Sequence, residues 1–404
     1  MRCNKLIYCI YFVPITRNKI LKYREMNMQE EPIVVAQIMG KWVGGGVEAV
    51  IMNYYRHIDR AKIQFDFICD ADSTCIPYDE IKELGGNVIL CPPYQKVFKY
   101  QKFLINLFKE KKYKIVHSNI NTLSVFPLRA AKKAGVPIRI AHNHATTSRK
   151  EWKRNILKKI FKRFIKFYST DYMACSIKAG KWMFGNKNII QNKVFILNNA
   201  IDVQLFKYNE VVRNKIRKEY EIKDNQIIIG HVGRMMQTKN QEFVIKVFYE
   251  LVKENDCILM LAGDGPDKEK IINQVDGLNL SSKVIFLGQK NNIADYYEAF
   301  DVLILPSLYE GFGMVTIEAQ CSNLPCVVST GVPFETKINE NYLFCDLSCG
   351  EKSWAKSILS LIKLNRRSDK TKRITEFGFD VNIESKKLEN KYFQLLEEKK
   401  LCQE

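Results

Sequence analysis

The chain has 404 residues, of which 46% are hydrophobic and 26% charged, and its formal net charge is +19. This length accommodates two domains with separate cores, and no apolar run reaches the roughly 18 residues of a membrane-spanning helix, which argues against an integral membrane protein. The 12 cysteines form no CxxC pair and no cluster at zinc-ligand spacing, so we expect reduced cytosolic thiols. The charge predicts an anionic partner: nucleic acid, an anionic lipid surface or a phosphorylated substrate.

Residues 1–30 differ in character from the rest of the chain. Their apolar run, Leu6–Val13, is interrupted by Pro14 and has basic residues on both sides. No small-residue cleavage site follows, which argues against a signal peptide. We expect a disordered or loosely attached extension, with Met26 or Met28 as the native start. The alternative is a short segment that touches a membrane.

From Pro32 onward, strand and helix patterns alternate. In the first half the expected strands are 33–39, 65–69, 87–91, 115–117, 138–141, 171–175 and 194–197, and the expected helices are 47–58, 77–84, 98–110 and 122–134. In the second half the expected strands are 227–230, 257–262, 284–287, 302–305 and 325–328. Repeated β–α units of this length predict parallel, doubly wound sheets.

The two series predict an α/β protein with two Rossmann-like domains, 31–200 and 201–380. A passage rich in Asn, Asp and Lys, residues 198–223, is expected to join them. The closing segment, 381–404, contains a charged amphipathic helix that we expect to pack back toward the first domain.

The segment 148–169 reads as a basic amphipathic helix in which Glu151 is the only acid. Lys and Arg dominate one side, and the other carries Trp152, Ile156, Ile160, Phe161 and Phe164. One interpretation is a surface helix that packs this apolar stripe on its own domain. The other is a helix that lies on an anionic membrane surface. Nucleic-acid binding is the weaker alternative, because no base-reading module accompanies the helix.

Two short motifs have alternative interpretations. Gly44-x-Gly46-x-x-Ala49 fits a dinucleotide fingerprint, but a triple glycine followed directly by Glu48 is unusual for that motif. The Asp70-x-Asp72 pair has the spacing of a metal–diphosphate site, but no further acid or His supports it, so we expect a turn. No P-loop of the G-x-x-x-x-G-K-[ST] type is present, which argues against an ATPase.

The most informative stretch is Val302–Val328, an apolar strand, a glycine-containing turn and a helix beginning near Met314. Glu310 and Glu318 flank the turn. Because ligands of open α/β sheets bind at the carboxyl ends of the strands, these carboxylates are candidates for ligand binding. Taken alone, the stretch fits a surface loop with two solvated glutamates equally well.

Other turns converge on the same edge of the sheet. Arg234 follows the first strand of this half, and Lys239 lies just before a helix, where two cations suit a diphosphate. Glycine turns end the next two strands, at Gly263-Asp264-Gly265-Pro266 and at Gly288. The convergence favours ligand binding over solvated glutamates.

These motifs together resemble the retaining glycosyltransferases of family 4, which have the GT-B fold of two Rossmann-like domains facing each other across a cleft. The resemblance rests on Gly233-Arg234…Lys239, Gly263-x-Gly265-Pro266, Gly288 and Glu310-Gly311-Phe312-Gly313…Glu318. In the first half, Gly44–Glu48 is similar to the family's glycine loop. Asn199-Ala200-Ile201-Asp202 is similar to its Asn-Gly-Ile-Asp linker, with Ala in place of Gly. The resemblance covers residues 32–396.

The resemblance implies roles for individual residues. Glu310 would bind hydroxyls of the donor sugar, Glu318 would bind the ribose, and Arg234 and Lys239 would neutralise the leaving diphosphate. The implied donor-binding set is Gly44, Gly45, Gly46, Gly233, Arg234, Lys239, Gly263, Gly288, Gln289, Glu310, Gly311, Phe312, Gly313, Met314, Val315 and Glu318, with Gln289 near the base and backbone amides contributed by 312–315.

A histidine after a strand of the first domain lies near the reacting sugar in the family. Here His142 and His144 both follow the strand 138–141, and position does not decide between them. His117 is a weaker candidate, and His57 and His231 are expected to be structural. The catalytic set that the resemblance implies is therefore the pair His142 and His144 with Arg234, Lys239 and Glu310.

The expected reaction is metal-independent hexosyl transfer from a nucleotide diphosphate sugar, UDP-sugar foremost, with retention and without a further cofactor. The basic helix favours a lipid-linked saccharide acceptor at the cytoplasmic face of the membrane, in capsule, exopolysaccharide or O-antigen assembly. The alternatives are a nucleotide-sugar 2-epimerase of similar architecture and a non-catalytic protein that binds sugar or nucleic acid.

Overall fold

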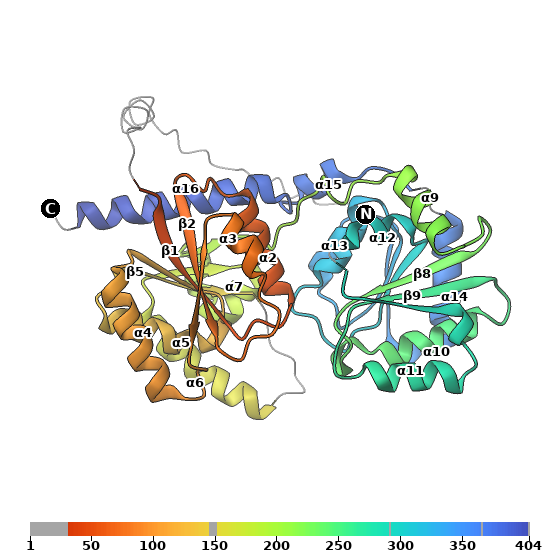
Figure 1. Cartoon of the computed structure of the whole chain (residues 1–404), viewed down its shortest axis with the longest axis horizontal. Coiled ribbons are helices and arrows are strands. Elements are labelled where there is room, and N and C mark those ends of the chain that lie inside the picture. Colours follow the sequence, from red (N-terminus) through yellow and green to blue (C-terminus); the bar gives the residue numbers. More distant parts are fainter. Residues whose placement is uncertain (1–30, 145–151, 291, 365–366, 403–404) are drawn as a thin grey trace, which may run out of the picture.

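The computed structural model describes residues 31–144, 152–290, 292–364 and 367–402. The extension expected over residues 1–30 lies outside this range. The described chain forms two domains that lie side by side, each built around one parallel sheet (Figure 1). This arrangement confirms the predicted α/β class with two doubly wound domains.

The N-terminal domain has a seven-stranded sheet of order β3-β2-β1-β4-β5-β6-β7, with all neighbours parallel. Its strands are β1 (Ile33–Gly40), β2 (Ile63–Asp70), β3 (Asn87–Cys91), β4 (Ile115–Ser118), β5 (Ile138–Asn143), β6 (Asp171–Ala174) and β7 (Val194–Ile196). The strand order reverses between β1 and β4. In open α/β sheets, a reversal of this kind opens a crevice for ligands at the carboxyl ends of the strands.

Helices cover both faces of this sheet, as the nearly continuous apolar strands require. One face carries α2 (Gly46–His57), α3 (Tyr78–Glu83) and the C-terminal helix α16 (Val381–Leu401). The other carries α4 (Val97–Lys111), α5 (Val125–Lys133), α6 (Trp152–Tyr168), α7 (Ile177–Phe184) and α8 (Asn186–Ile190). A 3₁₀ segment, Asn121–Ser124, leads into α5, so the helix expected over 122–134 begins with a tighter turn.

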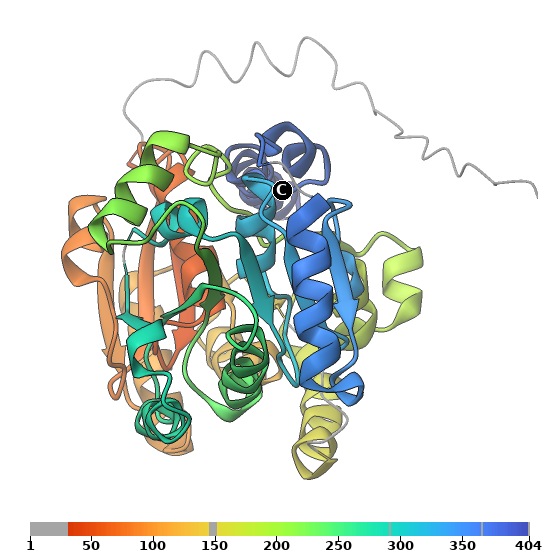
Figure 2. The ribbon, with the colours of Figure 1, turned by 90° about the vertical axis from the view of Figure 1, so that its right-hand side faces the viewer.

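The C-terminal domain has a six-stranded parallel sheet of order β10-β9-β8-β11-β12-β13. The strands are β8 (Ile227–Val232), β9 (Cys257–Ala262), β10 (Val284–Gly288), β11 (Val302–Leu305), β12 (Cys326–Ser329) and β13 (Tyr342–Cys345). One face packs against α9 (Glu210–Glu219), α12 (Ile293–Ala299), α13 (Met314–Cys321) and α15 (Thr371–Glu376). The other packs against α10 (Gln241–Leu251), α11 (Lys268–Gly277) and α14 (Gly350–Leu364). Figure 2 shows α14 from the side, in blue, and α10 and α11 along their axes.

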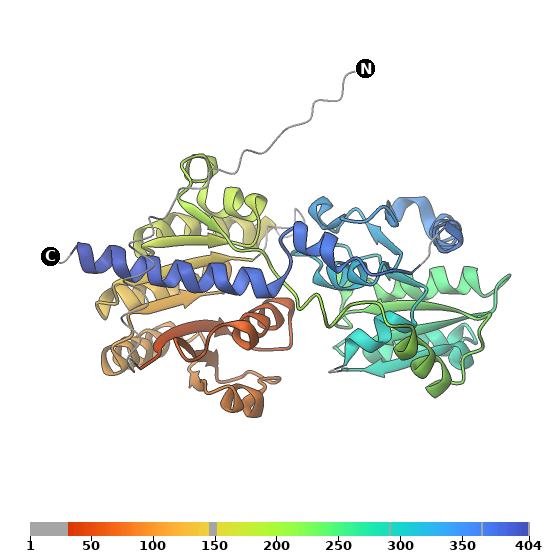
Figure 3. The ribbon, with the colours of Figure 1, turned by 90° about the horizontal axis from the view of Figure 1, so that it is seen from above.

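The chain crosses between the domains twice, and the two crossings are joined by backbone hydrogen bonds. The Ile201 N–H donates to the Phe379 carbonyl at 2.9 Å, and the Val381 N–H donates to the Ile201 carbonyl at 2.9 Å. After the second crossing, α16 lies along the N-terminal domain against α2 (Figure 3). The last helix of the chain is therefore part of the N-terminal domain, and the whole C-terminal domain lies between the two crossings.

Two expectations about individual elements need correction in part. The expected linker 198–223 contains α9, whose N-cap Asn209 accepts from the Val211 and Val212 amides, and which packs against α12. Its polar composition concealed it, because few of its side chains are apolar and buried.

The apolar stripe expected on 148–169 is also partly wrong. Phe161 packs into the core beside the buried Ile165, whereas Ile160 and Phe164 are exposed. The side chains of Trp152 and Ile156 lie outside the described part of the chain. The helix therefore has two apolar faces, of which one is covered by its own domain.

Candidate active site

The turns at the carboxyl ends of β8, β9 and β10 are linked by backbone hydrogen bonds. The Gly233 N–H donates to the Ala262 carbonyl at 2.9 Å, and the Gly263 N–H donates to the Gly288 carbonyl at 2.8 Å. The three glycine-containing turns singled out in the sequence therefore form one continuous edge. Because parallel strands point the same way, this is the edge where ligands of such sheets bind.

Glycine at 263 serves the packing of this edge. Its φ of +129° is one that other residues rarely adopt, and a Cβ there would lie 2.2 Å from the Gly233 carbonyl oxygen. A Cβ at Gly265 would meet the Met235 carbonyl oxygen at the same distance. Both glycines are required because neighbouring backbone segments approach too closely for a side chain.

Lys239 and Glu310, predicted from separate turns, contact each other. The Lys239 Nζ donates to Glu310 Oε1 at 2.6 Å, and the Ser307 hydroxyl donates to the same oxygen at 2.7 Å. A backbone bond from the Leu308 N–H to the Thr238 carbonyl, at 2.8 Å, ties the two turns together. Glu310 is only 7% exposed. A cation and a carboxylate are thus held at the strand edge within reach of one ligand.

Arg234 differs from Lys239 in its surroundings. Its side chain is exposed, and within the described ranges it makes no hydrogen bond or ion pair. Its backbone carbonyl accepts from Gln241 Nε2 at 3.0 Å, which fixes the turn that carries it. The guanidinium is therefore available to an anion.

The Glu310–Gly313 turn leads into α13. Gly313, with φ +89°, precedes the helix, and Met314 and Val315 form its first turn, where N–H groups have no intrahelical acceptor. The Phe312 ring is buried, 5.5 Å from the Phe379 ring, so this residue offers a ligand its backbone and not its side chain. The start of the helix presents partial positive charge, which suits an anionic ligand.

Glu318 lies further along α13. Its Oε2 accepts from the Tyr297 hydroxyl at 2.7 Å, and burial raises the pKa of its carboxyl. Tyr297 was not singled out from the sequence, although it orients one of the two predicted glutamates. The remaining carboxylate oxygen, Oε1, is the atom through which Glu318 could accept from ligand hydroxyls.

The glycine loop of the N-terminal domain faces this edge. A Cβ at Gly44, where φ is +73°, would lie 3.3 Å from Gln289 Nε2 of the other domain. Gly45 approaches the Glu48 carboxylate, which accepts from the Val43 N–H at 3.2 Å. Gly46 begins α2, and nothing lies within 4 Å of where its Cβ would be. The structure thus brings Gly44 and Gln289, predicted from different domains, together.

The histidine pair lies at the carboxyl end of β5, buried in the N-terminal domain. The His142 and His144 rings are 3.9 Å apart between centroids. Both ring nitrogens of His144 lie 3.2 Å from asparagine oxygens, those of Asn199 and Asn119. His142 Nδ1 lies 3.0 Å from His117 Nε2, and His142 Nε2 has no partner in the described structure. Burial lowers the pKa of His144 to about 4, so its ring is neutral at physiological pH.

The remaining histidines, expected to be structural, have backbone contacts. His231 Nδ1 lies 2.9 Å from the Ile304 carbonyl, and His57 Nδ1 lies 2.8 Å from the Asn53 carbonyl. Three polar residues around His117 and the histidine pair escaped the sequence analysis: Gln37, Asn119 and Tyr392. Only Asn119 offers a sequence signal, since it follows the end of β4 directly.

The D-x-D segment forms a turn. The Ser73 N–H donates to the Asp70 carbonyl at 3.0 Å, and Asp72 pairs with Lys41 at 2.7 Å. Over the described ranges, no three His, Cys, Asp or Glu side chains are grouped so that they could hold a metal ion. Nor does any helix within those ranges combine the length and apolarity that crossing a membrane requires.

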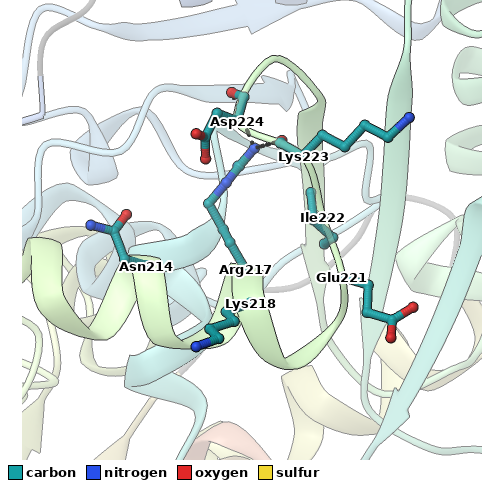
Figure 4. A pocket seen from close by; sticks show the side chains of 7 residues that line it. All are labelled: Asn214, Arg217, Lys218, Glu221, Ile222, Lys223 and Asp224. Atoms are coloured by element: carbon teal, nitrogen blue, oxygen red, sulfur yellow. Dashed lines mark hydrogen bonds between the residues drawn. The ribbon is translucent and has the colours of Figure 1, made fainter.

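A hollow of about 580 Å³ lies elsewhere in the C-terminal domain (Figure 4). It is lined by Asn214, Arg217, Lys218, Glu221, Ile222, Lys223 and Asp224. The Arg217 guanidinium donates to the carbonyls of Lys223 at 2.5 Å and Gln226 at 2.8 Å, so it holds the turn before β8. This hollow lies at the amino end of the strand, opposite the edge described above.

Comparison with known proteins identifies the family. The family model described as Glycosyltransferase Family 4 matches residues 44–205, and the model of glycosyl transferases group 1 matches residues 212–379. The chain is also 35% identical over 294 residues to the putative glycosyltransferase EpsF of Bacillus subtilis (strain 168), an alignment that covers 71% of this chain and 77% of EpsF. The chain belongs to the family 4 glycosyltransferases.

The glycosyltransferase is 28% identical over 376 residues to the capsular polysaccharide biosynthesis glycosyltransferase CapH of Staphylococcus aureus, covering 89% of this chain and 98% of CapH. Among solved structures, Anabaena HepE in complex with UDP and glucose matches with a TM-score of 0.67 and 18% identity, over 87% of this chain and 94% of HepE. WaaG, a glycosyltransferase involved in lipopolysaccharide biosynthesis, matches with a TM-score of 0.60 and 14% identity, over 87% and 95% of the two chains. These structures confirm the predicted GT-B fold of the glycosyltransferase.

Proposed function

We propose that this glycosyltransferase transfers a sugar from a nucleotide diphosphate sugar, foremost a UDP-sugar, to a saccharide acceptor with retention of anomeric configuration. The observation that carries the proposal is the pairing of Lys239 with Glu310 at an edge that the Gly44 loop faces from the other domain. A diphosphate needs cations and amide donors, and a sugar needs a carboxylate acceptor. Both kinds of group meet here.

Each residue has a separate role in this mechanism. Lys239 and the exposed Arg234 neutralise the negative charge that develops on the departing diphosphate, aided by the first-turn amides of α13. Glu310 accepts from sugar hydroxyls, and Glu318, held by Tyr297, accepts from the ribose. The leaving diphosphate assists deprotonation of the acceptor hydroxyl on the same face, so the mechanism needs no covalent enzyme intermediate. In this proposal Arg234 and Lys239 neutralise the diphosphate without a metal or further cofactor.

The acceptor that we propose is a lipid-linked saccharide used in cell-surface polysaccharide assembly. CapH is named for capsular polysaccharide biosynthesis. A further relative, 24% identical over 314 residues and covering 81% of that protein, is named UDP-Gal:alpha-D-GlcNAc-diphosphoundecaprenol alpha-1,3-galactosyltransferase, from Escherichia coli. That name combines a UDP-sugar donor with a polyprenyl diphosphate acceptor, the pairing proposed for this chain.

The outer surface of α6 supports an acceptor at the inner face of the membrane. Leu157, Ile160, Phe164 and Phe167 are between 47% and 65% exposed. They recur at three- and four-residue spacing along the helix, and the exposed cations Lys159, Arg163 and Lys166 lie among them. An exposed apolar stripe between cations is the composition of a helix that lies in an anionic lipid interface. We therefore place the protein in the cytoplasm, peripherally bound to the membrane.

Thermal-shift measurements with UDP-, GDP- and ADP-sugars test the donor. A nucleotide sugar that binds the folded state at 100 times its Kd stabilises that state by about 2.7 kcal/mol. We expect the largest rise in Tm with a UDP-sugar and its loss in Glu318→Ala. Equal shifts in the wild type and in Glu318→Ala would contradict the assigned site.

Product analysis with and without acceptor then separates the possible reactions. A transferase releases UDP in proportion to the glycosylated lipid that it forms. Conversion of the donor sugar without acceptor would indicate 2-epimerase activity, and donor binding without turnover in the presence of lipid-linked acceptors would indicate a non-catalytic protein. Either result would overturn the proposed reaction.

A further inference from the structure

Six buried polar side chains form one continuous chain of hydrogen bonds through the N-terminal domain. They come from β1, from β4 and the residue following it, from β5 and the residue following it, and from α16, and none is more than 2% exposed. The hydrogen bonds join them in the order His144, Asn119, Gln37, Tyr392, His117 and His142, and we call this the histidine network. The histidine network thus begins and ends at the pair His142 and His144.

The amide groups of Asn119 and Gln37 determine which group donates and which accepts in each hydrogen bond of the histidine network. Gln37 Oε1 accepts from Asn119 Nδ2 at 2.9 Å, and Gln37 Nε2 donates to the Tyr392 hydroxyl oxygen at 3.0 Å. The Tyr392 proton must therefore point away from Gln37. Its remaining neighbour in the chain is His117 Nδ1, at 2.6 Å, so the hydroxyl donates there.

The same order of donation continues from Tyr392 through His117 to His142. A neutral imidazole that accepts at one nitrogen carries its proton on the other, so His117 donates from Nε2 to His142 Nδ1 at 3.0 Å. By the same rule, His142 carries its proton on Nε2. Burial lowers the pKa of His117 to about 3 and that of His142 well below the ordinary value, which keeps both rings neutral near pH 7.

We propose that Tyr392 is a positioning residue that sets the tautomer of His142, so that His142 presents an Nε2–H donor and not a lone pair to a substrate oxygen. His142 Nε2 is the nitrogen that has no partner in the described structure, whereas both nitrogens of its neighbour His144 face asparagine oxygens. A buried donor without an acceptor favours a ligand that supplies one, such as a sugar hydroxyl or a phosphate oxygen. The substrate contact rests on the proposed function, but the tautomer does not.

Packing holds Tyr392 in this place. Its ring meets the His117 ring edge-on, with centroids 5.9 Å apart at 81°, and meets Phe65 at 6.5 Å. Leu388 and Leu395, one turn away on either side along α16, are buried in the same core. The hydroxyl cannot leave the chain unless α16 moves. The C-terminal helix therefore contributes to the histidine network the hydroxyl of Tyr392, in addition to the apolar side chains that it buries.

The tautomer can be measured directly, because the chain has only five histidines. Long-range ¹⁵N–¹H correlation spectra of histidine-labelled protein distinguish the two neutral tautomers from the ring nitrogen shifts. We expect His142 to be in the Nε2–H form in the wild type. In Tyr392→Phe, His117 Nδ1 loses its hydrogen-bond donor, so we expect His117 and His142 each to populate both neutral tautomers. A wild-type His142 in the Nδ1–H form would overturn the proposal whether or not any variant folds.

Kinetics show whether the tautomer matters to the reaction. We expect Tyr392→Phe to lower kcat by about 10- to 100-fold, the scale of a misoriented catalytic group, with little change in KM for the donor. Tyr100→Phe is the matched control, because Tyr100 is also fully buried and its hydroxyl has no partner in the described structure. If Tyr392→Phe keeps the wild-type tautomer, or loses no more kcat than Tyr100→Phe, Tyr392 is not a positioning residue. A changed tautomer in a protein that transfers no sugar would leave the tautomer assignment intact and contradict the proposed function.

Discussion

Lys239 serves two anions in the proposed mechanism, the Glu310 carboxylate that it contacts at 2.6 Å and the donor diphosphate. Arg234 has no competing partner within the described ranges, so its whole charge is available to the phosphates. Both cations act most strongly where charge develops in the transition state, and less on the ground state.

We therefore expect Lys239→Ala and Arg234→Ala to lower kcat by about 100-fold or more and to weaken UDP-sugar binding by a smaller factor. Steady-state kinetics and calorimetric Kd values measure the two effects separately. Lys270→Ala is the control, since this lysine belongs to the same domain and pairs with Glu242 on an exposed surface. Unchanged turnover in both site variants would remove these residues from the mechanism.

Asp70 illustrates a buried carboxylate outside the candidate active site. It is 1% exposed, its Oδ2 has no partner in the described structure, and burial raises its pKa from 3.8 to about 6. Between about pH 4 and pH 6 the folded state thus binds more protons than the unfolded state. By linkage, this group lowers the free energy of unfolding as the pH rises through that window.

Asp70→Asn is accordingly expected to raise the free energy of unfolding at pH 7.5 by about 1–3 kcal/mol, and to do so much less at pH 4. Urea unfolding at the two pH values measures the difference. Asp72→Asn, which alters an exposed carboxylate paired with Lys41, should have a small effect. A variant that is less stable than the wild type at pH 7.5 would show that the Asp70 charge is compensated.

Residues that end parallel strands were accessible from the sequence, and residues that reach them from elsewhere were not. Lys239 and Glu310 could be assigned to one edge because the carboxyl ends of parallel strands meet there, although their direct contact could not. Tyr392 lies 275 positions from His117, and no periodicity of α16 indicates which of its side chains meets a histidine. Tyr297 is similar: it reads as a core aromatic until the Glu318 contact is seen.

At the scale of elements, α6 shows what a helical pattern leaves open. The 3.6-residue period predicted a helix with one apolar stripe, but Phe161 and Ile165 face the core while Phe164 and Phe167 face outward. A helix with two apolar faces cannot be oriented from its sequence alone, because either face could be the covered one. The exposed face carries the proposal of membrane binding.

We expect the protein to sediment with vesicles that contain phosphatidylglycerol at low salt, and much less with neutral phosphatidylcholine or at high salt, because the cations contribute a screened attraction. The double variant Phe164→Glu, Phe167→Glu should lose most of this binding. Phe98→Glu is the matched control, since Phe98 is 91% exposed on α4. Binding that survives the double variant, or equal loss in the control, would place the lipid contact elsewhere.

On the scale of the whole molecule, the alternation of strands and helices sufficed to predict two doubly wound domains, because each β–α unit signals a parallel neighbour. It could not predict how the domains meet. The bridge between Ile201 and the segment 379–381 joins parts of the chain about 180 residues apart, and neither segment carries a pattern that indicates it. The return of the closing helix to the first domain was expected, but its contact with α2, in which the Ser385 hydroxyl donates to the His57 carbonyl 328 positions away, was not. The meeting of Gly44 with Gln289 is of the same kind.

The approach of Gly44 to Gln289 gives a test of how the two domains are placed relative to each other. The exposed Cys75 lies beside Gly44, with its Cβ 3.8 Å from where a Gly44 Cβ would be, and Gln289 Nε2 lies 3.3 Å from the same point. In Gln289→Cys, a short bismaleimide should therefore join the introduced thiol to Cys75 across the two domains, as peptide mass spectrometry would detect. Because the donor is proposed to bind with its diphosphate against the glycine loop and its base near Gln289, a saturating UDP-sugar should slow this crosslink severalfold.

The double variant Cys75→Ser, Gln289→Cys controls for the other thiols, since it should lose this crosslink and keep any formed elsewhere. A crosslink that forms equally fast with and without donor would place the nucleotide away from the Gly44 loop. No crosslink in Gln289→Cys itself would mean that the two domains do not meet at this point in solution. In either case the cations and glutamates of the C-terminal domain would have to bind the donor without the glycine loop, and the reaction would depend on a different approach of the two domains.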